Sequence, residues 1–221
     1  MTRRGPHRQS GRQETHPPAF VPASRCLYLA FYKPFEVLCQ FSPPEPGSEK
    51  ITLAHFDFPE RVYPVGRLDY DSEGLLILSD DGRLTTRLFD EDKPHDRTYL
   101  VQVENIPGKE SLRALETGVL VEGRMTRPAV ARLLAEPPEL PERSKPVRFR
   151  KNIPTAWLSL TLREGRNRQV RKMTAAVGHP TLRLARRSIG ALDLFELGLA
   201  PGEWMELGGD EVLKLFAKGT K

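Results

Sequence analysis

Cysteine is scarce in this 221-residue sequence, which contains only Cys26 and Cys39. Two cysteines without a C-x-x-C spacing are too few for a disulfide scaffold and favour a reducing cytosol, although a single bridge between them stays open. Long apolar runs are also missing: none approaches the roughly 18 residues that span a bilayer, and the start has no secretory-signal segment. The sequence therefore predicts a soluble, monomeric, cytoplasmic protein without membrane association.

Acidic residues are rare at the start of the chain. Residues 1–25 carry five arginines against the single acid Glu14, and the whole chain has a formal net charge of +5. This composition predicts a basic, disordered tail over 1–25 that attracts phosphates, followed by one globular domain over 26–221. A polyanionic partner such as RNA is favoured.

Segments with the apolar pattern of strands outnumber those with helical spacing. Strands are predicted at 27–31, 37–41, 75–78, 97–104, 119–121, 129–135, 156–163 and 181–188. Helices are predicted at 83–89, 109–117, from the Gly165 turn to Gly178, and at 211–218, with a helical turn at 52–56. The first two strands form a hairpin, and the prolines of 137–146 indicate a long loop. Because strands and helices do not alternate strictly, we expect an α+β fold with a mixed, mostly antiparallel sheet.

Carboxylates gather in one stretch, 66–82, which reads GRLDYDSEGLLILSDDG. Residues 69–80 nearly match a calcium loop, but the final bidentate Glu is missing and Pro64 prevents the entering helix of such a site. A structural interpretation also fits, because Asp71, Ser72 and Glu73 are well suited to shaping a turn. In the third interpretation Asp69 is catalytic, a nucleophile or base that Arg67 orients and keeps ionised.

Basic residues cluster between Gly165 and Lys172. Arg168, Arg171 and Lys172 are three or four residues apart, which predicts a shared helical face that binds phosphates together with Arg166. The alternative is a solvated basic face, but Glu164 is the one acid between 162 and 187. The arginines at 183, 186 and 187 could extend the surface. Tyr99 is either a core residue or a stacking platform for a base, and Arg97 points to the same side of its strand.

At these residues the chain resembles the pseudouridine synthases, in the ribosomal branch that includes the small-subunit type A and the large-subunit types B, E and F. The resemblance covers about residues 27–207 and is strongest to type E. We expect this chain to lack an S4 domain, and type E lacks one as well. The matching segments are Tyr32-Lys33-Pro34, GRLDYDSEGLL at 66–76, Thr98–Val101, and EGRNRQVRKM at 164–173.

The resemblance implies a specific chemistry and a set of residue roles. The family isomerises a uridine of RNA to its C-glycoside, here in 23S rRNA or an assembling large ribosomal subunit, without a cofactor or metal. Its fold is an α+β domain with a central cleft. Asp69 matches the catalytic aspartate, Tyr99 the tyrosine that packs on the uracil, and Arg171 the basic residue that pairs with the aspartate.

Further roles implied by the resemblance concern RNA binding. Arg67 matches the residue that fills the gap left by the flipped nucleotide, and Leu162 lines the base pocket. The other residues expected to bind RNA are Arg166, Arg168, Lys172 and Lys33. A non-catalytic rRNA-binding assembly factor is the alternative function, for which Asp69 would be dispensable.

Overall fold

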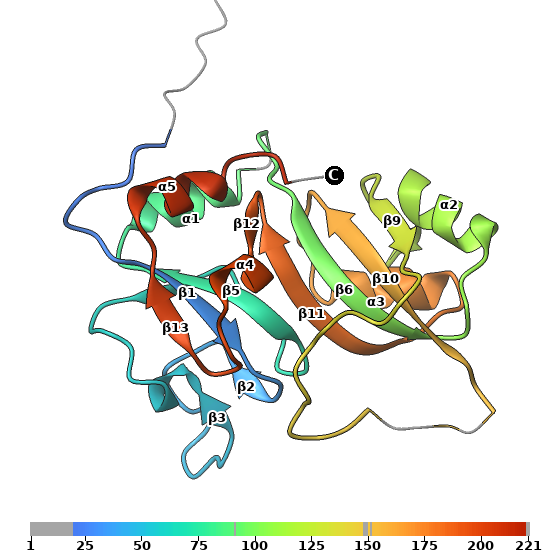
Figure 1. The fold of residues 1–221 in the computed structure, drawn as a ribbon, viewed down its shortest axis with the longest axis horizontal. Helices are drawn as coiled ribbons and strands as arrows, with labels where there is room; N and C mark the ends of the chain where they lie inside the picture. Colours follow the sequence, from blue (N-terminus) through green and yellow to red (C-terminus); the bar gives the residue numbers. More distant parts are fainter. Residues whose placement is uncertain (1–19, 91, 148–149, 151, 220–221) are drawn as a thin grey trace, which may run out of the picture.

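The computed structural model describes residues 20–90, 92–147, 150 and 152–219. Its centre is a nine-stranded mixed sheet in the order β13-β1-β5-β11-β6-β10-β9, with β4 beside β5 and β12 beside β11 (Figure 1). The strands of this sheet are β1 (Tyr28–Lys33), β4 (Tyr63–Val65), β5 (Glu73–Ser79), β6 (Arg97–Glu104), β9 (Val130–Leu133), β10 (Thr155–Leu162), β11 (Thr181–Ile189), β12 (Leu192–Asp193) and β13 (Trp204–Glu206).

Short helices and two small strand pairs surround the sheet. The helices are η1 (Leu53–His55), α1 (Gly82–Leu88), α2 (Lys109–Thr117), α3 (Gln169–Ala176), α4 (Leu194–Leu197) and α5 (Gly209–Lys214). The pairs are β2 (Val37–Leu38) with β3 (Ile51–Thr52), and β7 (Leu120–Val121) with β8 (Arg124–Met125). No helix among the described residues has the length and apolarity needed to cross a bilayer.

The first half of the sheet is built around β1 and β5, in which every residue is buried. Burial on both faces explains why the 75–78 segment is a continuous apolar run rather than an alternating one. One face packs against α1 and α5, and the other against η1 and the aromatic rings that follow it. This half carries the 66–72 loop immediately before β5.

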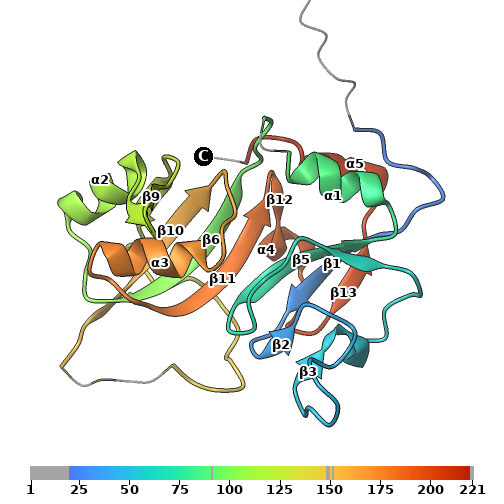
Figure 2. The same cartoon turned by 180° about the vertical axis from the view of Figure 1, so that it is seen from behind.

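The second half consists of β11, β6, β10 and β9, with α2 and α3 packed on it (Figure 2). Leu115 of α2 and Met173 of α3 are fully buried against the strands. The apolar spacing of each helix thus fixes its position on the sheet. The segment 163–168 connects β10 to α3 within this half.

The two halves meet where β5 and β11 run parallel over a short register, Ala185 opposite Glu73 and Arg186 opposite Gly74. The other pairings within the main sheet are antiparallel. At Gly74, φ is +102°, and a Cβ there would lie 2.3 Å from the main-chain oxygen of Arg186. Glycine therefore permits both the backbone conformation and the close approach of the two halves.

The predicted α+β class, the mostly antiparallel mixed sheet and the strand at 97–104 are confirmed. The predicted hairpin of the first two strands is wrong, because β2 contains only residues 37–38 and pairs in parallel with β3. The predicted tail lies largely outside the described residues. Within it, however, Phe20 is buried and stacks on Phe216 at 4.8 Å, so residue 20 belongs to the packed domain.

Candidate active site

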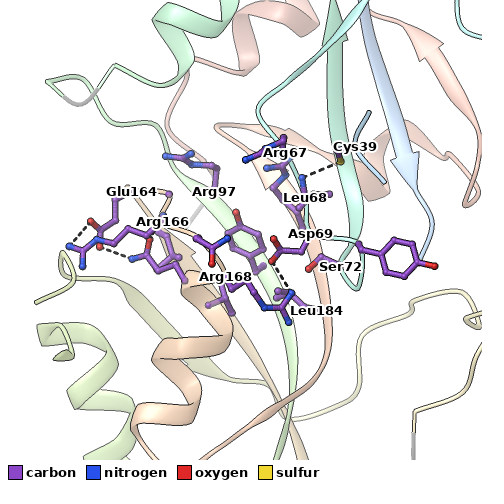
Figure 3. Close-up of a pocket in the computed structure, with 18 of the residues that line it drawn as sticks. Cys39, Arg67, Leu68, Asp69, Ser72, Arg97, Glu164, Arg166, Arg168 and Leu184 are labelled. Atoms are coloured by element: carbon purple, nitrogen blue, oxygen red, sulfur yellow. Dashed lines mark hydrogen bonds and ion pairs between the residues drawn. The ribbon is translucent and has the colours of Figure 1, made fainter. Parts of the chain in front are cut away.

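A cavity of about 460 Å³ lies at the junction of the two halves of the sheet. The 66–72 loop forms one side of it, and β6, β10 and the segment 164–170 form the other (Figure 3). Six of the predicted site residues line this cavity: Arg67, Asp69, Tyr99, Leu162, Arg166 and Arg168. The structure thus brings together residues from four separate segments of the sequence, and the predicted central cleft is confirmed.

Hydrogen bonds to main-chain groups fix the loop that carries Asp69. Ser72 N–H closes a turn on the carbonyl of Asp69 at 3.0 Å, and Leu68 N–H donates to the Cys39 sulfur at 3.3 Å. Three consecutive carbonyls are each bound by a different part of the chain: Tyr70 O by Glu36 N–H at 2.9 Å, Asp71 O by Arg171 Nη2 at 2.7 Å, and Ser72 O by Lys33 Nζ at 2.7 Å. The position of Asp69 is therefore set before any substrate binds.

Two arginines and two aspartates form a charged cluster at the cavity. Arg168 donates two hydrogen bonds to the Asp71 carboxylate, at 2.8 and 2.7 Å, and its Nη1 lies 3.7 Å from Asp69 Oδ2. Burial acts to raise the pKa of Asp71, but the hydrogen bond from Arg168 and the charges of Arg171 and Arg168 outweigh it, so that pKa is lowered. Asp71 is thus bound by both arginines, whereas Asp69 has a single, longer ion pair of 3.7 Å with Arg168.

The predicted pairing of Arg171 with Asp69 is wrong. The ion pair of Asp69 is made by Arg168, and that of Arg171 by Asp71, with Nε 3.3 Å from Oδ2. The predicted shared helical face also fails, because α3 begins at Gln169 and Arg168 precedes it in a left-handed conformation with φ of 52°. This turn directs Arg168 toward the carboxylates of the 66–72 loop.

Tyr99 and Leu162 form the apolar part of the cavity wall. Tyr99 is half-buried and packs against the apolar clusters of both halves of the sheet. Within the described residues its hydroxyl makes no hydrogen bond, so the ring has a free polar end in the cavity. Leu162 is buried on the neighbouring strand β10. A planar base could pack against these two side chains.

Arg67 lies at the edge of the cavity and is exposed. No hydrogen bond or ion pair joins its guanidinium to the described part of the chain. The preceding Gly66, with φ of +75°, packs on Phe89, whose ring would clash with a Cβ at that position. Arg67 therefore projects from a fixed backbone, and its charge is unpaired within the described part of the chain.

Arg166 and Lys172 are paired with nearby acids. Arg166 contacts Glu164 at 3.2 Å and donates to the carbonyls of Arg124 and Met125, at 3.3 and 2.6 Å. Lys172 lies 2.7 Å from Glu122 and does not line the cavity. Their RNA-binding roles stay predictions.

The prediction that Lys33 binds RNA is wrong, because the side chain is fully buried and hydrogen-bonded to the carbonyls of Pro34 and Ser72. Burial lowers the pKa of Lys33 to about 8. It holds the Asp69 loop from behind and cannot reach a phosphate.

The suggested extension of the basic surface along β11 is wrong for Arg183 and Arg187, whereas Arg186 lines the cavity. Arg183 forms a buried bidentate pair with Glu73 at 2.9 and 2.8 Å, and Arg187 pairs with Asp193 at 2.7 Å. Arg186 is buried and donates to the carbonyl of Leu75. These partners are distant in sequence or lie beyond 187, which is why a local count of acids missed them.

The calcium interpretation does not fit the contacts of the loop. Asp71 is bound by Arg168 and Arg171, and Glu73 by Arg183, so two of the required carboxylates already hold cations. Among the described residues, no group of three His, Cys, Asp or Glu side chains is placed to hold a metal ion. Cys26 and Cys39 are both free thiols.

Sequence reasoning missed several residues of the cavity wall, including Cys39, Phe89 and Leu184. The predicted placement of Arg97 on the same side of its strand as Tyr99 is confirmed, because both residues line the cavity. For Cys39 and Phe89 there was no signal, since their contacts depend on how distant loops pack.

Comparison with known proteins now identifies the family. Residues 27–176 match the family model described as RNA pseudouridylate synthase. The chain therefore belongs to the RNA pseudouridylate synthase family. A protein of Xanthomonas campestris named ribosomal large subunit pseudouridine synthase E is 53% identical over 182 residues, covering 80% of this chain and 94% of that protein. The synthase E of Vibrio vulnificus is 46% identical, covering 81% and 74%.

More distant members of the family agree. Ribosomal large subunit pseudouridine synthase B of Bacillus subtilis is 38% identical, covering 86% of this chain and 72% of that protein. A solved structure titled pseudouridylate synthase superposes with a TM-score of 0.70 at 28% identity, covering 86% and 74%. The prediction that the chain belongs to the ribosomal branch, and within it resembles type E, is confirmed.

Proposed function

We propose that this synthase isomerises a specific uridine of large-subunit 23S rRNA to pseudouridine, with Asp69 acting on the target nucleotide. The observation that carries the proposal is the placement of Asp69. It is the carboxylate of the loop that is not clamped by two arginines, and it lines a cavity with the ring of Tyr99 and the side chain of Leu162. The names of the relatives supply the substrate class.

The reaction exchanges one bond for another without oxidation or reduction. The N1–C1′ bond of uridine breaks, a C5–C1′ bond forms, C5 loses its proton to solvent, and N1 gains one. Asp69 serves as the nucleophile at the sugar or as the base that starts elimination. Because the chemistry is redox-neutral and needs one carboxylate, the residues of the cavity are sufficient for it.

The other cavity residues have roles that follow from their positions. The target uridine leaves its stack to reach Asp69, and the exposed Arg67 occupies the space that it vacates. Tyr99 packs on the uracil and is placed to assist in removing the C5 proton. Arg168 and Arg166 contact the RNA backbone at the rim. Arg171 keeps Asp69 in position through the main chain of Asp71.

The proposal includes the setting in which the protein works. It acts as a monomer in the cytoplasm on 23S rRNA or on an assembling large subunit. Residues 26–221 form its catalytic domain, and the basic residues of 1–25 contribute a salt-sensitive attraction to RNA. Family membership favours this enzyme over the non-catalytic assembly factor, which has no use for a positioned Asp69.

Release of tritium tests the proposal. Large-subunit rRNA transcribed with uridine labelled with tritium at C5 is incubated with the protein, since isomerisation sends that label into water. We expect release up to one equivalent per target site, and none from small-subunit rRNA. If large-subunit RNA releases no label under conditions in which it binds, the proposed activity is excluded.

A further inference from the structure

Arg97 is a buried arginine that has no acidic partner among the described residues. It lies on β6, is 7% exposed, and its Nε is buried without a hydrogen bond. No carboxylate of the described residues forms an ion pair with it. Its side chain lines the cavity, and Figure 3 draws it to the left of Arg67, on the side of Glu164 and Arg166. Burial lowers the pKa of Arg97, as does the charge of Arg186.

Arg186 has the same character. It is 2% exposed, lines the same cavity, and leaves its Nη2 buried without a partner. The other arginines of its strand differ from it: Arg183 is paired with Glu73 and Arg187 with Asp193. Of the three arginines on β11, the one that lines the cavity is therefore the one without an ion pair. Glu164, the acid whose charge acts to raise the pKa of Arg97, is bound by Arg166 and Gln169.

The residues around Arg97 hold its side chain in place. The Phe89 ring lies 5.2 Å from the guanidinium carbon, and Gly165 leaves room for Nη1, which a Cβ would approach to 3.1 Å. Such packing holds the guanidinium in one orientation. Holding a buried, uncompensated charge there costs free energy, and an anion that enters the cavity would offset that cost.

We propose that Arg97, supported by Arg186, is a phosphate-binding site inside the cavity, and that its ligand is an RNA phosphate that flanks the target nucleotide. A nucleotide that reaches Asp69 brings its two phosphates to the cavity wall. The planar guanidinium can donate two parallel hydrogen bonds to a phosphate, whose negative charge also balances that of the arginine. A uracil carbonyl is neutral and would leave the charge of Arg97 unbalanced. This inference rests on the proposed RNA substrate and adds to it a residue that positions the target nucleotide.

A double-mutant cycle, in which the protein and the RNA are each altered, tests whether the ligand of Arg97 is a phosphate. The RNAs are a substrate fragment and two versions in which the phosphate 5′ or 3′ of the target uridine is an uncharged methylphosphonate. Arg97→Met should weaken binding of the normal fragment about tenfold and reduce the slope of log Kd against log salt by about 0.7 to 0.9. One methylphosphonate should weaken the wild type by a similar factor and leave Arg97→Met unaffected.

Two controls separate this role from a structural one. Arg97→Met removes an unpaired buried charge, so the free protein should be as stable as the wild type or more stable. Arg187→Met breaks the pair with Asp193, so it should lower stability and leave the salt slope unchanged. Arg97→Lys keeps the charge without the planar guanidinium and should recover part of the affinity.

Two results would overturn the inference. One is an equal loss of affinity for Arg97→Met on all three RNAs, which indicates a contact to the base or sugar. The other is an unchanged salt slope together with lower stability, which indicates a structural residue. Tritium release by the wild type is measured in parallel, so a failure of the proposed function is recognised independently of Arg97.

Discussion

Arg171 and Asp71 are joined twice across the junction of the two sheet halves. Nη2 of Arg171 donates to the main-chain oxygen of Asp71 at 2.7 Å, and its Nε lies 3.3 Å from Oδ2 of the same residue. Arg171 belongs to α3, and Asp71 to the loop before β5. A helix of one half thus holds the backbone two residues from Asp69, which links the separation of the halves to the position of the carboxylate.

Arg171→Met should slow the reaction far more than it weakens RNA binding. The side chain is 14% exposed and does not line the cavity, so its loss removes support from the Asp69 loop without removing a contact to RNA. A misplacement of about 1 Å can cost roughly a hundredfold in rate. Single-turnover tritium release at saturating enzyme measures the rate, and anisotropy measures Kd. An equal loss in both would show that Arg171 contacts RNA directly.

Asp69→Asn should abolish tritium release while RNA affinity stays within about twofold. The amide keeps the shape of the side chain but cannot act as nucleophile or base. Asp71→Asn, in the same loop, is the matched comparison: it weakens the bonds from Arg168 and should slow the reaction without stopping it. Turnover by Asp69→Asn at the wild-type rate would remove Asp69 from the chemistry.

Stability should depend on pH through Lys33. Its pKa falls from 10.5 in the unfolded chain to about 8 in the folded one, because of burial. Between these values the unfolded chain binds more protons, so stability rises with pH. From pH 7.5 to pH 10 the wild type should gain roughly 2 kcal/mol relative to Lys33→Met.

Urea unfolding at the two pH values measures the gain attributed to Lys33. Lys50→Met, which alters an exposed lysine, is the control and should show the same pH dependence as the wild type. If wild type and Lys33→Met change in parallel, Lys33 does not titrate in this range.

The parts of the fold that follow from local patterns were predictable. The strand at 97–104 and the helix at 109–117 match at both ends, because alternation, helical spacing and the Gly118 stop are all local signals. The placement of Asp69 beside Tyr99 in one cavity was predictable only through the family resemblance. Periodicity alone does not say that the loop before β5 faces β6.

The charge pairings were not predictable, because they join residues far apart in the sequence. Glu73 and Arg183 are 110 positions apart and meet at the parallel register of β5 and β11. Lys33 ends a strand of otherwise apolar and aromatic residues, and its burial depends on carbonyls that only the folded loop presents. Basic residues near one another in sequence were therefore overcounted as RNA ligands.

Arg183→Met should destabilise the protein without changing the salt dependence of RNA binding. Its loss leaves the Glu73 carboxylate buried and unpaired, at a cost of about 3 to 5 kcal/mol. The double variant Glu73→Leu/Arg183→Met should recover much of that loss. Urea unfolding and salt titrations check both points, and a reduced salt slope for Arg183→Met would place this residue at the RNA after all.

Gly74→Ala tests whether the close approach of β5 and β11 sets the site. The added methyl group would lie 2.3 Å from the Arg186 oxygen, and φ of +102° is strained for alanine. Relief requires the two strands to separate, which moves the Asp69 loop relative to Arg186 and Tyr99. We expect a loss of at least about 2 kcal/mol and a lower single-turnover rate in the molecules that remain folded.

The control for Gly74→Ala is Gly82→Ala. Gly82 begins α1, lacks a positive φ, and has open space around its Cβ position. Alanine there should be neutral or slightly stabilising, because it lowers the entropy of the unfolded chain and favours the helix. If Gly74→Ala is destabilised but its folded fraction reacts at the wild-type rate, the junction supports stability alone. A rate that falls only in this variant ties the geometry of the site to the contact between the two halves.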